Sequence, residues 1–462
     1  MSKIHYPASE ANGTESATTG KLHIIGTFID APSCDILRVR ENTMIIVDLE
    51  SGLIESIEEA PKVEGNRPAE VNNGMMAYVP GFVDCHIHAA QFLQLGTKTD
   101  VPLMEWLNKY TFPAESAFSD DAHASKVYDS VVRSTLRTGT TTACYFGSNY
   151  TSSTLLLGQL CHHYGQRALV GKVCSDQLVP DNYIETKNQS VEDTKRFIES
   201  FEAIPGDLVK PIITPRFVPT CSKDLLDKLG ELAKIHDCHV QTHAAEIASL
   251  HPDLKRDIPI LNSSNLLRGT GKTILAHCTH LLDPELQFIS DKASVIACPL
   301  SNLLFARAVV PVKRYMKHGV QVALGTDVAG GWSSSMLDSI RMATVASGVH
   351  GMQPPVDRTR NPEDHVLQES KEEEERFGFV MAFHLGTAAG GKALGLDTGV
   401  FERGMKWDAL KVELVGDEER ERLPMMKEMG WRDMVERWIC QGGGERGIRE
   451  VWVDGNLVME RR

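Results

Sequence analysis

The stretch PGFVDCHIH, residues 80–88, begins with an apolar run and ends in two histidines. Alternate residues of a strand face the same side, so His86 and His88 could bind one cation together. A bare HxH pair is also common by chance, and two polar side chains near a turn would explain it. The rest of the chain therefore has to distinguish the two interpretations.

Seven further β-rich runs follow this stretch and alternate with amphipathic helical stretches. They are TTTACYF (140–146), ALVGKVC (168–174), VKPIITPRF (209–217), HVQTHAAE (239–246), TILAHC (273–278), SVIACP (294–299) and QVALGTDVA (321–329). KVYDSVVRSTLRTG (126–139) and KDLLDKLGELAKIH (223–236) are typical of the helical connections. Eight strands joined in this way predict an α/β fold, a (β/α)8 TIM-type barrel over residues 81–395.

The two ends of the chain have a different character. HIIGTFID (23–30), TMIIVDLE (43–50) and LIESIEEA (53–60) read as short strands, and REVWVDGNLVME (449–460) reads as a hairpin that turns at Asp454-Gly455. We expect a small β-rich domain formed from N- and C-terminal segments, residues 21–80 plus 396–462. The composition of residues 1–20, which is rich in Ser, Thr, Ala and Gly, predicts a disordered tail.

Composition excludes several classes of protein. Of the 462 residues, 42% are hydrophobic and 24% charged, which is typical of a globular chain rather than a disordered or fibrous one. No apolar run approaches the roughly 18 residues of a membrane-spanning helix. The net charge of −14 argues against general binding of nucleic acid or anionic membranes. The N-terminus has no visible secretory signal and the ten cysteines form no CxxC pair, so we expect a cytoplasmic protein.

Three more side chains with metal-binding chemistry stand at predicted strand ends. His243 ends HVQTH, His277 ends TILAH and Asp327 ends ALGTD. The carboxyl ends of barrel strands meet at one mouth, so these residues and the two histidines of PGFVDCHIH should converge there. Imidazole and carboxylate suit zinc, and an incomplete protein shell leaves room for water. Glu246 alone would read as a carboxylate in the first turn of a helix, but beside a metal it is a natural proton shuttle.

The whole pattern resembles the amidohydrolase superfamily and, within it, the guanine deaminase branch. The resemblance covers nearly the whole chain, and its specific motifs are HIHAAQF (86–92), PLMEWLNKYTFPAE (102–115), TPRF (214–217), THAAE (242–246) and GTDVAGG (325–331). It implies an enzyme of purine catabolism that hydrolyses guanine to xanthine and ammonia. It also implies one Zn²⁺ per chain and a homodimer.

Roles for individual residues come from the same resemblance. It implies that zinc is bound by His86, His88, His243 and Asp327, that catalysis uses Glu246, His277 and Asp327, and that the base is held by Gln91, Arg216 and Phe217. The chemistry suits guanine, because a guanidinium can donate to the carbonyl O6 and an amide can both donate and accept. A phenyl ring offers a face for stacking.

The sequence departs from the family pattern at three places. Ala297 stands in IACPLSN where relatives often have a histidine, Cys278 follows AH where glycine is more usual, and the acidic segment 351–376 is longer than expected. Two alternatives stay open: another deaminase of the superfamily, of cytosine, adenine or triazine type, or a non-catalytic scaffold relative. Gln91 with Arg216 and Phe217 favours guanine, and the complete ligand set argues against a scaffold.

Overall fold

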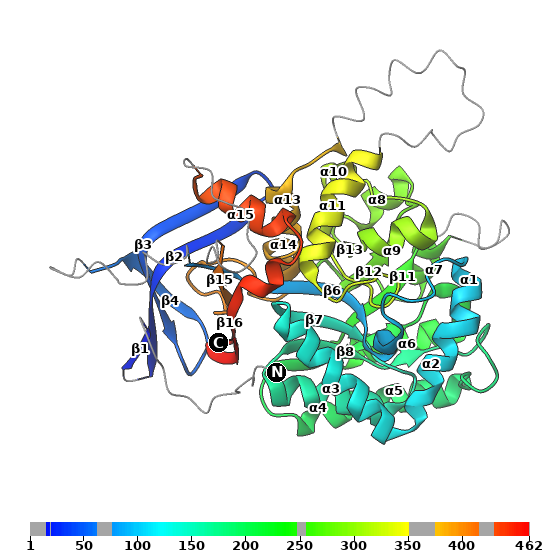
Figure 1. Cartoon of the computed structure of the whole chain (residues 1–462). Coiled ribbons are helices and arrows are strands. Elements are labelled where there is room, and N and C mark those ends of the chain that lie inside the picture. The colour runs from blue at the N-terminus through cyan, green and yellow to red at the C-terminus, as the bar shows by residue number, and fades with distance from the viewer. Residues whose placement is uncertain are drawn as a thin grey trace, which may run out of the picture.

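The middle of the chain forms a barrel of parallel strands with helices around it (Figure 1). A computed structural model describes residues 15–18, 20–61, 76–246, 256–350, 375–414 and 429–461. The barrel strands are β6 (Phe82–His88), β7 (Thr140–Phe146), β8 (Arg167–Gly171), β10 (Val209–Pro215), β11 (His239–Ala244), β12 (Thr273–His277), β13 (Ser294–Ala297) and β14 (Gln321–Leu324), and the short β9 (Val173–Cys174) pairs with β10. They coincide with the eight predicted runs, so the predicted fold class is confirmed.

Hydrogen bonds beyond the end of β14 close the barrel against β6. The backbone N–H of Asp327 donates to the carbonyl of His86 at 2.9 Å, and the N–H of His88 donates to the carbonyl of Val328 at 3.0 Å. The first and last strands therefore meet at their carboxyl ends. This closure brings a histidine and an aspartate that are far apart in sequence to one side of the mouth.

Helices follow the barrel strands in turn. They are α3 (Asp121–Arg137), α4 (Thr151–Tyr164), α5 (Lys187–Ser200), α6 (Lys223–Ile235), α7 (Asp257–Ser263), α8 (Asp283–Ile289), α10 (Val312–Lys317) and α11 (Met336–His350). In α6, Leu225, Leu229 and Ala233 are buried at helical spacing. The helix begins after Ser222, whose hydroxyl accepts a hydrogen bond from the backbone N–H of Leu225.

Apolar side chains fill the interior of the barrel. Val83, Cys85, Cys144, Leu169, Ile212, Ile274, Ile296, Cys298 and Ala323 form one buried cluster. Ala393 and Leu394, at the end of α14 (Ala388–Ala393), belong to the same cluster. With its interior packed in this way the barrel is no pore, and a site has to lie at the strand ends.

The small domain is a mixed sheet that joins both ends of the chain. Its order is β17-β16-β15-β5-β2-β3-β4, with β1 paired to β2. The strands are β1 (Glu15–Thr18), β2 (Lys21–Ser33), β3 (Ile36–Asp48), β4 (Ile54–Glu59), β5 (Met76–Pro80), β15 (Ala409–Glu413), β16 (Ile448–Val453) and β17 (Asn456–Glu460). Between the last two, Asp454 and Gly455 have φ of 53° and 81°, as the predicted tight hairpin requires.

Some predictions fall on parts of the chain that the structure does not describe. Of the predicted tail over 1–20, residues 1–14 and 19 lie outside the described residues, whereas Glu15–Thr18 form β1. Residues 351–374 of the acidic segment also lie outside them. The predicted domain boundaries stay a prediction. None of the described helices combines the length and apolar character that crossing a membrane needs.

A buried ion pair links the barrel to the small domain. Arg167, at the start of β8, donates to Asp408 beside β15 through Nε at 2.9 Å and Nη2 at 3.1 Å. The substitution Asp408→Asn removes the buried countercharge of Arg167 and leaves only the partly exposed Asp454, at 3.1 Å from Nη2, as its ion-pair partner. We therefore expect the free energy of unfolding to fall by about 3 kcal/mol. Chemical denaturation measures this change. The matched control is Asp237→Asn, because Asp237 makes its ion pairs while 71% exposed. Equal stability of the two variants would show that the buried pair between Arg167 and Asp408 does not stabilise the fold.

Candidate active site

A pocket opens at the carboxyl ends of the barrel strands. The polar side chains that line it include His88, His243, His277, Glu246 and Asp327. Its apolar lining includes Leu103, Met104, Trp106, Leu107 and Phe305. Four of these five apolar residues belong to the segment between β6 and α3, which therefore covers one side of the mouth.

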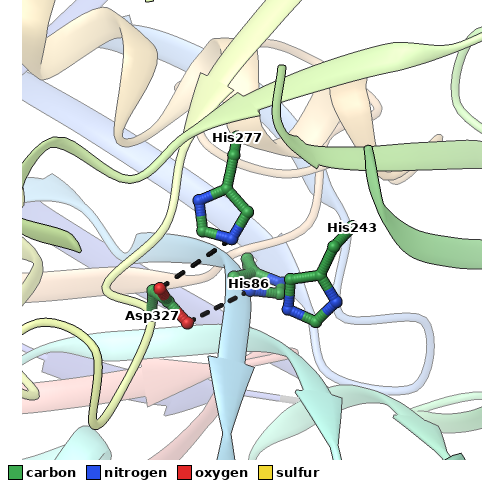
Figure 2. Close-up of side chains that lie close together, drawn as sticks. All are labelled: His86, His243, His277 and Asp327. Carbon is green, nitrogen blue, oxygen red and sulfur yellow. Dashed lines mark ion pairs between the residues drawn. The ribbon is translucent and has the colours of Figure 1, made fainter. Parts of the chain in front are cut away.

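Figure 2 shows three histidines and one aspartate turned toward one another. His86, His243, His277 and Asp327 each offer one ligand atom, and these four atoms all lie within 4.8 Å of one another. Asp327 Oδ1 is 3.2 Å from His86 Nε2, and Asp327 Oδ2 is 3.9 Å from His277 Nε2. His88 joins this group, with its Nε2 3.1 Å from His243 Nε2 and 3.5 Å from Asp327 Oδ1. All five residues that the sequence singled out thus meet at one point.

Hydrogen bonds at the outer nitrogen orient two of these rings. His243 Nδ1 lies 2.6 Å from the carbonyl oxygen of Arg216, and His277 Nδ1 lies 2.8 Å from Asn302 Oδ1. Since an oxygen of this kind only accepts, each Nδ1 carries the proton. In His243, whose ring is neutral, Nε2 is then an acceptor that faces the cluster, which is the arrangement a metal ligand needs.

The remaining two histidines have buried nitrogens that make no hydrogen bond within the described residues. Neither nitrogen of His86 makes a hydrogen bond within the described residues, and neither does Nδ1 of His88. Unpaired buried polar atoms are costly unless something else satisfies them. Three or more imidazoles and a carboxylate are the donor set of a zinc site with room for water. The residues present therefore fit a divalent metal.

Burial and neighbouring charges shift the pKa values of the cluster. Burial lowers the pKa of His86, His88 and His243, so these rings are neutral and able to ligate near pH 7. Burial alone would raise the pKa of Asp327, but the neighbouring imidazoles hold it far below its usual range. The carboxylate is therefore ionised, as a ligand must be.

A different balance applies to Glu246 and His277. Burial raises the pKa of Glu246, which favours the protonated acid. Burial alone would lower the pKa of His277, but the carboxylates of Glu246 and Asp327 raise it overall. His277 Nε2 stands 3.9 Å from Glu246 Oε2 and also 3.9 Å from Asp327 Oδ2. Both side chains are thus suited to hold a proton next to the cluster.

The backbone at two strand ends is in the left-handed region. His277 has φ of 69° and Asp327 has φ of 50°, a conformation that residues with a side chain rarely adopt. Such residues concentrate at functional sites, where the surrounding structure holds them. Asp84 fixes the backbone just before Asp327, since its carboxylate accepts hydrogen bonds from Thr326 Oγ1 at 2.5 Å and from Thr326 N at 3.0 Å. Burial raises the pKa of Asp84 to about 7.

The three residues expected to hold a base also line the pocket. Gln91 comes from the segment after β6, and Arg216 and Phe217 follow β10. The side chain of Arg216 is only 3% exposed and makes an ion pair with Glu115 at 2.6 Å. Its guanidinium carbon lies 4.9 Å from the centre of the Phe112 ring. The structure thus gathers a donor fork, an amide and an aromatic face beside the cluster.

Sequence reasoning did not identify three of these contributors. Glu115 and Phe112 both stand in PLMEWLNKYTFPAE, and Asp84 stands within PGFVDCHIH. Both motifs contribute to the family resemblance, but their sequence alone does not assign these roles to Glu115, Phe112 or Asp84. The sequence feature that could have drawn attention to Glu115 is its position as the last residue of a largely apolar motif. That position does not reveal which residues pair with the carboxylate.

The two single-residue departures lie close to the site but not in the pocket wall. Ala297 ends β13, is 3% exposed, and is not among the described residues that line the pocket. Cys278 is fully buried and has φ of 53°. A glycine would adopt that φ without strain, which explains why glycine is usual after the histidine. Neither departure removes a residue of the cluster.

Comparison with known proteins places the chain among enzymes of one family. A family model described as the amidohydrolase family matches residues 77–458. Guanine deaminase of Mus musculus is 38% identical over 458 residues, which cover 94% of this chain and 96% of the mouse protein. Guanine deaminase of Homo sapiens is 37% identical with the same coverage of both chains.

Solved structures show the same similarity. A crystal structure of guanine deaminase from C. acetobutylicum, described as having guanine bound in its active site, superimposes with a TM-score of 0.80. The two sequences are 29% identical, and the match covers 94% of this chain and 99% of the other. The barrel, the small domain and the arrangement between them are therefore shared.

Proposed function

This chain belongs to the amidohydrolase family, and we propose from that premise that it hydrolyses guanine to xanthine and ammonia. The observation that supports the proposal is that two sets of side chains lie in one pocket. A cluster of four histidines and Asp327 lies beside Gln91, Arg216 and Phe217. The first group suits metal-assisted hydrolysis, and the second offers contacts for a flat base with a carbonyl group.

A zinc ion would be held by His86, His88, His243 and Asp327, with His277 beside it. His86 Nε2, which lies 3.2 Å from Asp327 Oδ1 and makes no hydrogen bond within the described residues, supports a metal at this point. When bound, zinc supplies Lewis acidity that makes a water molecule nucleophilic near neutral pH. We propose one zinc ion per chain. The choice of zinc rests on the nitrogen-rich donor set.

The protein side chains would move the protons. Asp327, whose carboxylate is ionised, accepts a proton from the attacking water. Glu246, whose pKa burial raises, donates a proton to the ring nitrogen beside C2 of guanine. Water adds to C2, and His277 donates a hydrogen bond to the tetrahedral intermediate as charge develops. Proton delivery to the exocyclic amine then lets ammonia leave, and the C2 carbon keeps the water oxygen as the carbonyl of xanthine.

The direct test is release of ammonia by purified protein from guanine, with adenine, cytosine, adenosine and a triazine in parallel. Turnover of guanine with none of the others is the expected result. A metal-loaded protein that leaves guanine untouched and hydrolyses another base would overturn the substrate assignment. A protein without metal and without turnover on any base would instead support the scaffold alternative. Homodimer formation, a cytoplasmic location and a role in purine catabolism stay predictions.

Arg216→Lys tests the recognition of the base. Lysine keeps the positive charge but loses the planar fork, so we expect KM for guanine to rise by about 10- to 100-fold with a smaller change in kcat. Steady-state kinetics measure both constants. Arg314→Lys is the control, because the side chain of Arg314 is 41% exposed and pairs with Asp283 at the surface. An unchanged KM in Arg216→Lys would exclude a contact between this guanidinium and guanine.

A further inference from the structure

The carboxylate of Glu115 links Gln91 and Arg216, two of the three side chains proposed to hold the base. It accepts from Gln91 Nε2 at 2.9 Å, from Tyr183 Oη at 2.7 Å, and from Arg216 Nη1 and Nη2 at 2.6 and 3.1 Å. The residue is 1% exposed, and it is not among the described residues that line the pocket. Glu115 therefore acts on whatever binds there only through its neighbours.

We propose that Glu115 is a positioning residue that sets the specificity of the site for a purine with a carbonyl group at C6. The inference rests on the proposed function, since Gln91 and Arg216 must face the base for Glu115 to act. The structure supports it at two places, the amide of Gln91 and the guanidinium of Arg216. In both, the carboxylate determines which hydrogen-bonding groups remain available to the pocket.

The amide of Gln91 is held in one of its two orientations. A carboxylate only accepts, so the amide nitrogen must face Glu115. The amide oxygen accepts from the backbone N–H of Ala329 at 3.2 Å. One N–H and one lone pair of the amide remain for a ligand. Without an obligate acceptor at Glu115, only the longer hydrogen bond from Ala329 would still favour this orientation of the amide.

The guanidinium of Arg216 is held at its edge and at its face by one helical turn. Glu115 takes two parallel hydrogen bonds from the edge, and Phe112 lies against the face at 4.9 Å. Both residues belong to α2 (Phe112–Ser116) and stand three positions apart, so they project from the same side. The remaining N–H groups only donate, which favours a carbonyl oxygen and disfavours an amino group at C6.

The support beneath Glu115 is itself buried and fixed. Tyr183, whose hydroxyl donates to Glu115, is held at its carbonyl by Asn149 Nδ2 at 2.8 Å. Two residues further on, Glu185 accepts from the fully buried Lys172 Nζ at 2.7 and 2.9 Å. These contacts hold the acceptor in place before a ligand arrives, which is what pre-organisation of a binding site requires.

The test compares guanine with 2,6-diaminopurine, which carries an amino group in place of the C6 carbonyl. In Glu115→Gln, one amide would face four donor atoms and could not accept from all of them. We expect kcat/KM for guanine to fall by about 10- to 100-fold, mainly through KM, and the preference for guanine over 2,6-diaminopurine to shrink by about 10-fold or more. Glu115→Asp keeps the charge and should retain more of the preference than Glu115→Gln.

Controls separate positioning from general destabilisation. Asp408→Asn breaks another buried bidentate pair far from the pocket, so it should lower stability without changing the preference between the two purines. Metal content per chain, measured by mass spectrometry, should be unchanged in Glu115→Gln. If the wild type turns over guanine but Glu115→Gln keeps its KM and preference, the inference is wrong. If the wild type itself does not turn over guanine, the proposed function fails first.

Discussion

Replacing Glu246 by glutamine is expected to lower kcat for guanine by about 10²- to 10⁴-fold, the usual contribution of a positioned general acid or base. Glutamine matches the size of the side chain but cannot deliver a proton to the ring nitrogen. Glu246 lines the pocket beside His277 without belonging to the group of ligand atoms. The bound metal should therefore stay at the wild-type level, and KM should change little.

Steady-state kinetics and metal analysis on the same preparation measure this result. Glu199→Gln is the control, because Glu199 is half exposed on α5, away from the pocket lining. Near-normal turnover in Glu246→Gln would show that another group carries the proton. Loss of metal together with turnover would show instead that Glu246 supports the metal site.

The substitution Asp327→Ala should have the largest effect of all. It removes a proposed ligand and the proposed base together, so we expect turnover to fall by about four orders of magnitude or more. Metal content should fall with it. The carboxylate lies within 3.5 Å of both His86 Nε2 and His88 Nε2, so its loss leaves these rings without the ionised partner that favours a cation.

Chelation and reloading give a second measurement of the same site. Wild-type protein stripped of metal should lose turnover and regain it with zinc, whereas Asp327→Ala should regain little. Asp408→Asn, which also replaces a buried aspartate, should keep its metal. A variant Asp327→Ala that holds a full complement of metal would remove this residue from the ligand set and leave the four histidines as the candidates.

These predictions concern residues that the sequence alone predicts to lie together at the mouth of the barrel. The histidines and Asp327 follow apolar runs, and consecutive parallel strands of a barrel all present their carboxyl ends at one mouth. Strand position alone therefore predicted that His86, His243, His277 and Asp327 would meet, and the structure brings their ligand atoms within 4.8 Å. The hairpin at Asp454-Gly455 was equally local, because two residues with positive φ specify its turn.

Contacts between distant segments could not be read in this way. Glu115 and Arg216 are 101 positions apart, and Asp84 and Thr326 are 242 positions apart. The strand β15 was also not predicted. Its five residues form a strand by pairing with β5 on one side and β16 on the other, and both partners are distant in sequence. No periodicity encodes the partner of a carboxylate, because the partner depends on how loops pack after the barrel has closed.

The sequence by itself thus determined the barrel, the small β-rich domain and the set of residues that meet at the mouth. Each of these follows from local patterns: apolar runs of strand length, amphipathic helical spacing, and polar residues placed where strands end. Only the tertiary structure decided that Glu115 holds Gln91 and Arg216, and that Asp84 holds the turn before Asp327. The physical reason is that a buried carboxylate is stabilised by donors from whichever segments surround it, and folding of the whole chain selects those segments.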